Sequence, residues 1–186
     1  MQGEINKVVA LLNKGRVILY PTDTIWGLGC SAIDPIAIQR LKTIKERQEG
    51  KNLIILVSGI DMLKRYVTTV PEQAIEAMEK SPYPLTIIYP QAKKLPISLL
   101  SQDQSIGIRV PKNDFCQRLI ATLDAPLVST SANISSEPSP ATFENISSTL
   151  RSRVDYIVPA IYEQKALHTA SSILKIEADN SLTKIR

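Results

Sequence analysis

The sequence has few of the residues on which much familiar catalytic chemistry depends. Its 186 residues include one histidine, two cysteines and seven glycines. His168 alone cannot supply the several imidazoles of a zinc or iron site, and Cys30 and Cys116 lie far apart without a CxxC pair. No GxxxxGK[ST] phosphate loop is present. We therefore expect no metal site, no disulfide framework and no P-loop.

The sequence also has few aromatic residues, no long apolar run and no strong excess of one charge. No segment approaches the roughly 20 apolar residues of a membrane-spanning helix, and the N-terminus lacks a secretory signal pattern. Aromatic residues make up 5% of the chain and are not interleaved with basic ones, which argues against RNA binding by base stacking. The net charge of +4 is compatible with anionic ligands. A cytoplasmic protein without a membrane partner is expected.

What is present is the composition of a globular protein, with 44% apolar and 22% charged residues. Helical and strand periodicities alternate, which predicts an α/β (α+β) fold in one domain over residues 1–186. The Ser- and Pro-rich segment 131–142 is predicted to be an ordered loop. Helices are predicted over 5–12, 35–45, 71–80, 114–123 and 143–150. Strands are predicted over 16–20, 52–57, 85–89, 105–110 and 126–130, with shorter strand-like pieces at 155–158, 171–176 and 183–186.

Residues 27–32 match the GxGxxG/A pattern of dinucleotide-binding proteins. In that motif the helix begins at the glycines, so that its first amides meet the pyrophosphate. Here Asp34 and Pro35 start a helix only after the motif has ended, and Pro21 interrupts the strand that should lead into it. A nicotinamide-dependent dehydrogenase is therefore only a distant alternative.

Three other features are compatible with an anionic ligand. A cation cluster at the end of the predicted helix 35–45 is explained by the helix dipole at least as well as by a polyphosphate clamp. The hydroxyl-rich segment 129–133 follows a predicted strand, where short polar side chains can hold phosphate or sugar oxygens. Arg109, inside an apolar strand, needs an acidic partner or an anionic ligand. The cation cluster consists of Lys42, Lys45, Arg47 and Lys51.

Taken in order, these segments resemble the motifs of the threonylcarbamoyl-AMP synthase family, the YrdC-like, TsaC-type proteins. The similarity begins with GRVILYPTDTIWGLG at 15–29 and continues with the KxR element at 45–47. Together the ordered motifs cover nearly the whole chain and are more specific than any one alone. The remaining motifs are PLT at 84–86, GIRVP at 107–111, STSAN with its SxN element at 129–133, and SSI at 171–173.

The resemblance implies a twisted open mixed sheet flanked by helices, with a basic concave cavity. It also implies an activity: L-threonine and bicarbonate or CO2 form a carbamate, whose oxygen attacks the α-phosphorus of ATP and displaces pyrophosphate. The product, threonylcarbamoyl-AMP, serves tRNA-modification proteins that make threonylcarbamoyladenosine. ATP is a substrate that carries Mg2+ with it, and contact with tRNA or other RNA is left open. Because the carbamate is already anionic, no His base or Ser nucleophile has to be activated.

The resemblance implies roles for the residues of this chain that match the family's motifs. Lys45 and Arg47 are predicted to be catalytic. The threonine carboxylate is predicted to pair with Arg109, with Thr24, Ser129 and Ser171 completing the amino-acid pocket. The predicted ATP contacts are Arg47, Lys51, Ser105, Ser131, Asn133, Ser139 and Arg186.

The chain departs from the family pattern at positions that shape loops. Because Gly permits backbone angles and close approaches that Tyr does not, Tyr83 in place of a usual Gly is predicted to reshape a cavity wall. Such changes motivate an alternative function, that of a YrdC-like RNA- or nucleotide-binding paralogue without synthase activity. The other departures are Gln48 and Asn52 for Pro, Ser136 for Gly, Trp26 for Tyr and Ser172 for Thr.

Overall fold

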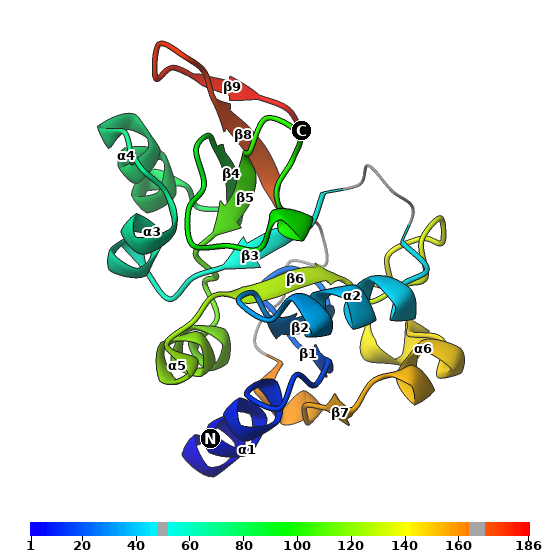
Figure 1. The fold of residues 1–186 in the computed structure, drawn as a ribbon. Helices are drawn as coiled ribbons and strands as arrows, with labels where there is room; N and C mark the ends of the chain where they lie inside the picture. The colour runs from blue at the N-terminus through cyan, green and yellow to red at the C-terminus, as the bar shows by residue number, and fades with distance from the viewer. Residues whose placement is uncertain (48–51, 164–169) are drawn as a thin grey trace.

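The computed structural model describes residues 1–47, 52–163 and 170–186, and these residues form one mixed sheet with helices around it (Figure 1). The strands are β1 (Ile18–Tyr20), β2 (Gly27–Ser31), β3 (Ile54–Leu56), β4 (Leu85–Tyr89), β5 (Ile106–Arg109), β6 (Leu127–Ser131), β7 (Tyr156–Ile157), β8 (Ser172–Ile176) and β9 (Leu182–Lys184). Their order in the sheet is β7-β1-β2-β6-β3-β5-β4-β8-β9. Some neighbours are parallel, such as β3 and β5, and others antiparallel, such as β2 and β6. The predicted open mixed sheet flanked by helices is confirmed.

The helices in the described ranges are α1 (Gln2–Leu12), α2 (Pro35–Ile44), α3 (Ile60–Tyr66), α4 (Glu72–Lys80), α5 (Asp114–Leu123) and α6 (Ser148–Arg153). In Figure 1, α3 and α4 lie beside the part of the sheet that contains β4 and β5. α1 packs against α5, and α2 packs against β2. None of these helices is long and apolar enough to cross a membrane.

The start of α2 follows from local sequence signals. The Asp34 carboxylate accepts hydrogen bonds from the backbone N–H groups of Ile36 at 2.9 Å and Ala37 at 3.0 Å. Pro35 occupies the first helical position, where the missing N–H removes no helical hydrogen bond. The helix therefore begins after the GxGxxG-like segment 27–32, as predicted.

The sequence patterns do not predict β2 or α3, and they misplace one helix. Two glycines weaken the strand signal of residues 27–31, which nevertheless form a central strand. The predicted helix 143–150 is wrong in its extent, because a 3-10 turn at 143–145 is separated from α6. Ser147 starts the new helix, since its Oγ accepts the backbone N–H of Leu150 at 3.2 Å.

Candidate functional site

One face of the sheet contributes Gly27, Ser129 and Ile54 to the floor of a cavity. Gly29 in β2, Ser129 in β6, Ile54 in β3 and Gly107 in β5 follow one another across the sheet as paired residues. Paired residues project to the same face, so this face carries mainly small and polar side chains. The opposite face carries fully buried apolar residues, among them Leu28, Cys30, Val128, Ile55 and Ile108.

Glycine at position 29 is required by the close approach of Tyr20. A Cβ atom there would lie 2.8 Å from Tyr20 Cε1 and 2.9 Å from the backbone oxygen of Val128. The tyrosine ring fills this space, and its hydroxyl donates a 2.8 Å hydrogen bond to Ser129 Oγ. The two glycines thus make room for a buried tyrosine and not for a pyrophosphate. This packing explains why residues 27–32 match the dinucleotide-binding pattern without that function.

The cavity above this floor has a volume of about 290 Å³. Its walls come from the β1–β2 connection, the end of β6 with the loop that follows, and the segment from Ala170 to Arg186. Most of the predicted site residues line it: Thr24, Arg47, Arg109, Ser129, Ser131, Ser139, Ser171 and Arg186.

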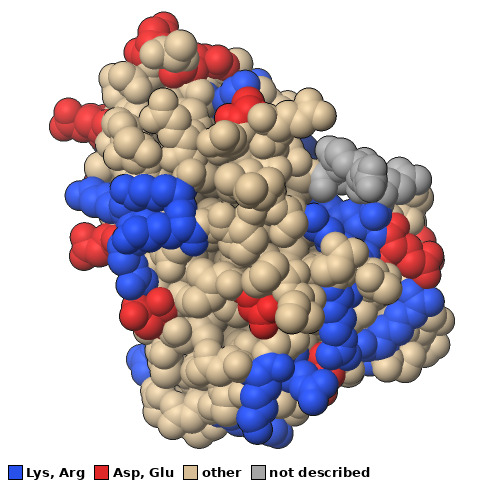
Figure 2. All heavy atoms as spheres, viewed as in Figure 1, with Lys and Arg blue, Asp and Glu red and all other residues tan. Residues whose placement is uncertain are grey.

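The positive charge of the cavity is local. Its described lining residues include Arg47, Arg109 and Arg186 and no aspartate or glutamate. On the molecular face in Figure 2, by contrast, Lys and Arg gather in separate groups with acidic side chains between them. A cavity walled by low-dielectric protein strengthens the interaction of its cations with an anion. The arrangement therefore suits a multiply charged anionic ligand.

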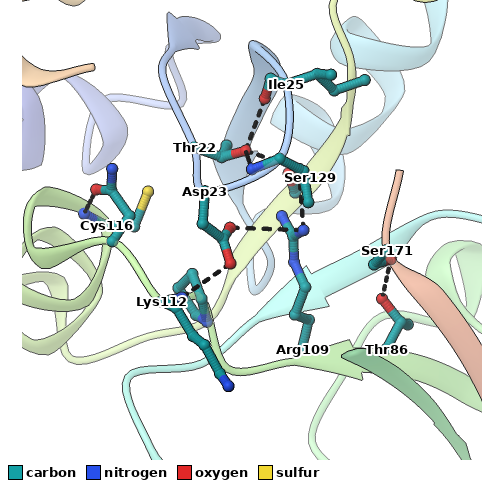
Figure 3. A network of polar contacts seen from close by, with 12 residues as sticks. Thr22, Asp23, Ile25, Thr86, Arg109, Lys112, Cys116, Ser129 and Ser171 are labelled. Atoms are coloured by element: carbon teal, nitrogen blue, oxygen red, sulfur yellow. Dashed lines mark hydrogen bonds and ion pairs between the residues drawn. The ribbon is translucent and has the colours of Figure 1, made fainter. Parts of the chain in front are cut away.

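Arg109 extends from the end of β5 toward the β1–β2 connection (Figure 3). Its side chain is only 4% exposed, and its Nη1 donates to Thr24 Oγ1 at 3.0 Å. The same nitrogen lies 3.6 Å from Asp23 Oδ1, and Asp23 Oδ2 accepts the backbone N–H of Lys112 at 2.9 Å. Asp23 thus compensates the buried charge and helps to hold the guanidinium near the cavity.

Several buried polar atoms near the cavity lack a hydrogen-bond partner among the described residues. They include Arg109 Nε, Asp23 Oδ1 and Trp26 Nε1. Burying such atoms unpaired costs free energy, so they are usually satisfied in folded proteins. Their concentration around one cavity is typical of a site arranged for a ligand.

Two pairs of hydroxyl groups each include a serine that lines the cavity, Ser129 in one pair and Ser171 in the other. Burial raises the pKa of Tyr20 well above its ordinary value, so its phenol stays protonated and donates to Ser129. Ser129 keeps its own proton for another acceptor. On β4 and before β8, the hydroxyls of Thr86 and Ser171 lie 2.8 Å apart (Figure 3).

Arg47 lies where the segment after α2 meets the end of β6. Its Nη1 donates to Thr130 Oγ1 at 3.2 Å, and its Nη2 donates to the backbone oxygen of Asn52. Partial burial lowers the pKa of Arg47, but an arginine remains charged at neutral pH. The guanidinium is therefore a fixed cation in the cavity wall.

Lys45 is placed differently from the prediction that it is catalytic. Its ammonium is buried and donates to the backbone oxygens of Ser131 at 2.7 Å and Asn133 at 2.8 Å, and to Asn133 Oδ1 at 3.1 Å. Lys45 is not among the residues that line the cavity. These hydrogen bonds hold the backbone of the SxN loop in place.

Two of the predicted ATP contacts, Ser105 and Asn133, are not among the residues that line the cavity. Ser105 precedes β5 and donates to Asp103 Oδ1 at 2.6 Å. The side-chain N–H groups of Asn133 donate to the backbone oxygens of Ile134 at 3.0 Å and Glu137 at 2.7 Å, which shapes the loop. Lys51 lies outside the described residues, as do Gln48 and His168.

The residues near or in the cavity that have no role in the predicted site include Thr22, Asp23 and Thr130. Thr22 and Thr130 line it, and Asp23 pairs with Arg109. Thr22 and Asp23 lie in the PTDT segment next to Thr24, and this closeness in the sequence could have indicated that they belong to the site. No sequence feature connects Asp23 with Arg109, because the ion pair joins distant segments.

Tyr83 and Ser136 are two of the departures that lie within the described residues. Tyr83 is 63% exposed and does not line the cavity, so the prediction that it reshapes a cavity wall is wrong. Ser136 has a φ of 77°, a left-handed conformation that favours glycine. The loop therefore keeps the backbone shape expected of the usual glycine even though serine occupies the position.

No group of three or more His, Cys, Asp or Glu side chains that could hold a metal ion occurs within the described ranges. The chemistry available at the cavity is thus that of arginines, hydroxyl groups and backbone amides. Such groups bind and orient anions and stabilise developing negative charge.

Comparison with known proteins decides the family. Residues 10–186 match the family model Sua5_yciO_yrdC, described as "Telomere recombination". The chain belongs to the Sua5/YciO/YrdC family. Within it, a threonylcarbamoyl-AMP synthase of Vibrio vulnificus (strain YJ016) is 31% identical over 161 residues, which cover 85% of this chain and 87% of that protein. A protein of the same name from Xanthomonas euvesicatoria pv. vesicatoria (strain 85-10) is 32% identical over 158 residues, covering 83% and 84% of the two chains.

Solved structures of the Sua5/YciO/YrdC family share this fold. E. coli YciO superposes with a TM-score of 0.83 at 28% identity and covers 100% of this chain and 89% of its own. P. abyssi Sua5 complexed with L-threonine gives a TM-score of 0.85 at 25% identity over 96% of this chain. The match covers 52% of the Sua5 chain, so this chain spans about half the length of that relative.

Proposed function

We propose that this protein is an L-threonylcarbamoyladenylate synthase, which makes threonylcarbamoyl-AMP and pyrophosphate from L-threonine, bicarbonate or CO2, and ATP. The observation that carries the proposal is the presence of Arg47 and Arg109 in one hydroxyl-lined cavity without an acidic lining residue in the described ranges. Relatives named threonylcarbamoyl-AMP synthase, which align with most of this chain, support the same activity.

Threonine binding is assigned to the Arg109 side of the cavity. A guanidinium pairs well with a carboxylate, and this one is buried and held by Asp23 and Thr24. Ser129 and Ser171 provide hydroxyl groups beside it. The complex of P. abyssi Sua5 with L-threonine supports this assignment by analogy.

ATP binding is assigned to the Arg47 side. Arg47, Ser131, Ser139 and Arg186 line the cavity and would hold the phosphates and sugar, while Lys45 holds the SxN loop. The Mg2+ that accompanies ATP would be coordinated by phosphates and water, because the described lining residues include no aspartate or glutamate side chain.

The reaction requires the site to bring two anions together and to stabilise charge. The neutral threonine nitrogen bonds to the carbon of CO2 and loses a proton to water, which leaves an anionic carbamate. A carbamate oxygen then attacks the α-phosphorus as the bond to pyrophosphate breaks. Fixed cations and hydroxyl donors stabilise the charge that spreads over the phosphate oxygens. No covalent enzyme intermediate is needed, which agrees with buried Cys30 and Cys116 thiols.

The product would be consumed by tRNA-modification proteins in the cytoplasm. The reaction itself requires no contact between this chain and tRNA. A basic cavity too small for a duplex, together with the separate groups of Lys and Arg on the face in Figure 2, supports small anionic substrates as the primary ligands.

Pyrophosphate release in the presence of ATP, bicarbonate and L-threonine tests the proposal. We expect release that depends on threonine, and a loss of roughly a hundredfold in rate for Arg47→Ala, as for removal of one charge-stabilising donor. Arg118→Ala, at an exposed position on α5, is the matched control and should retain the wild-type rate. Release that is absent or independent of threonine would contradict the proposal.

A further inference from the structure

The hydrogen bonds between two hydroxyl groups in the cavity wall can have only one donor direction. Thr22 and Thr24 lie in the β1–β2 connection and are 2% and 4% exposed, and both line the cavity. Their hydroxyl oxygens are 2.9 Å apart, and Arg109 Nη1 lies 3.0 Å from Thr24 Oγ1. The backbone oxygen of Ile25 lies 2.6 Å from Thr22 Oγ1 (Figure 3).

The contacts of Thr22 determine which acceptor receives its hydroxyl proton. A carbonyl oxygen can only accept, so Thr22 must donate its single hydroxyl proton to Ile25. The backbone N–H of Thr24 donates to Thr22 Oγ1 at 3.0 Å and occupies one of its two lone pairs. The second lone pair faces Thr24 Oγ1, which must therefore be the donor in the contact between the hydroxyls. Thr22 is then fully hydrogen-bonded.

The hydrogen bonds of the Thr24 hydroxyl determine what it presents to a ligand. Its proton goes to Thr22, and one of its lone pairs accepts from Arg109. One lone pair remains, so Thr24 can act toward the cavity only as an acceptor. Ser129 has the opposite character, since it accepts from Tyr20 and keeps its proton to donate.

We propose that Thr22 is a positioning residue that keeps the Thr24 hydroxyl an acceptor, so that the cavity selects a carboxylate ligand with an adjacent N–H donor. Arg109 faces the carboxylate, and Thr24 accepts from the α-nitrogen of the amino acid. The inference deepens the proposed function, on which it rests, and identifies how the site recognises the α-amino acid class.

The substitution Thr22→Val tests this assignment because it keeps the shape of the side chain and removes the hydroxyl. The Thr24 proton is then free to rotate toward the cavity, where it opposes a donor on the ligand. We expect the dissociation constant for L-threonine to rise about tenfold, the scale of one lost hydrogen bond. Binding of 3-hydroxybutyrate, which lacks the α-nitrogen, should change by less than about twofold. L-2-Aminobutyrate, which keeps the nitrogen and lacks the hydroxyl, should weaken as threonine does.

Thr22→Ser is the matched control, since it keeps the oxygen and should restore threonine binding and selectivity. Thr24→Val removes the acceptor itself and should show the same selective loss, which covers the case in which Thr22→Val does not fold. Titration calorimetry measures all three ligands on each folded variant. Equal weakening of threonine and 3-hydroxybutyrate, or unchanged threonine binding in either folded variant, would overturn the inference. Wild-type protein that binds no threonine would instead overturn the proposed function, and the inference with it.

Discussion

The ammonium of Lys45 donates a 2.7 Å hydrogen bond to the backbone oxygen of Ser131, which joins the end of α2 to the last residue of β6. Two further contacts reach Asn133, and the backbone oxygen of Lys45 accepts the N–H of Ser135 at 2.8 Å. The turn at Lys45 is supported by Glu46, which pairs with Arg153 at 2.7 Å. The SxN loop is therefore shaped by a residue that lies next to it only in the folded chain.

Replacing Lys45 by Met is expected to loosen this loop. Several buried acceptors lose their donor, so the free energy of unfolding should fall by about 2 kcal/mol, and the KM for ATP should rise. Chemical unfolding and steady-state kinetics measure the two effects. The exposed Lys14 provides the control, and Lys14→Met should change neither quantity. A Lys45→Met protein with wild-type stability and ATP affinity would contradict the positioning role.

Arg109→Lys is expected to impair threonine binding more than ATP binding. Lysine keeps the charge but cannot reproduce a planar fork between Thr24, Asp23 and a carboxylate. The KM for threonine should rise by at least about tenfold, which corresponds to about 1.4 kcal/mol, while the KM for ATP stays within about twofold. Kinetics with each substrate varied in turn distinguish these outcomes. A larger effect on ATP would place Arg109 on the nucleotide side instead.

Gly29→Ala is expected to destabilise the fold. The added Cβ would approach both Tyr20 and the backbone of Val128 to less than 3.0 Å, so the floor of the cavity would have to shift. Overpacking of this kind costs about 2 kcal/mol, and urea unfolding measures it. Gly3→Ala in α1 meets no atom within 4 Å and should be neutral or slightly stabilising. Equal stability of the two variants would contradict the packing assigned to Tyr20.

Both thiols are expected to be unreactive in the folded protein. Burial is the main reason that the pKa of Cys30 and Cys116 is raised, so little thiolate forms at pH 8. A thiol reagent should label neither cysteine in native protein and both after unfolding in urea. The unfolded thiols, with an ordinary pKa of 9.0, lose protons above that pH while the folded ones keep theirs. The free energy of unfolding should therefore fall as the pH rises above 9; rapid labelling of native protein would be inconsistent with this account.

Sequence patterns predict the elements with strong local signals. The cap at Asp34 and Pro35 determines the start of α2, and buried apolar runs such as 85–89 correspond to strands. β2 is not predicted because its glycines weaken the strand pattern. The reason for glycine here is the packing of the Tyr20 ring, a contact between paired strands that the sequence does not show. The extent of α6 depends on a serine cap inside a segment that has helical periodicity throughout.

The sequence likewise predicts some residues of the candidate site and not others. Hydroxyl and arginine residues within motifs, such as Arg109 and Ser129, are predictable because their residue types suit anions. The placement of Lys45 against the SxN loop and of Asp23 against Arg109 depends on tertiary contacts between distant segments. Hydrogen-bond direction at Thr24 requires the positions of all its neighbours, which no spacing in the sequence provides.

The adenylate that we propose for this protein contains threonine joined through a carbon derived from bicarbonate. Mass spectrometry of the product formed from ATP, L-threonine and isotopically labelled bicarbonate measures this connection. We expect a threonylcarbamoyl-AMP that carries the label, together with pyrophosphate. Failure to form a threonine-dependent adenylate, or formation of one without the label, would contradict the proposed function.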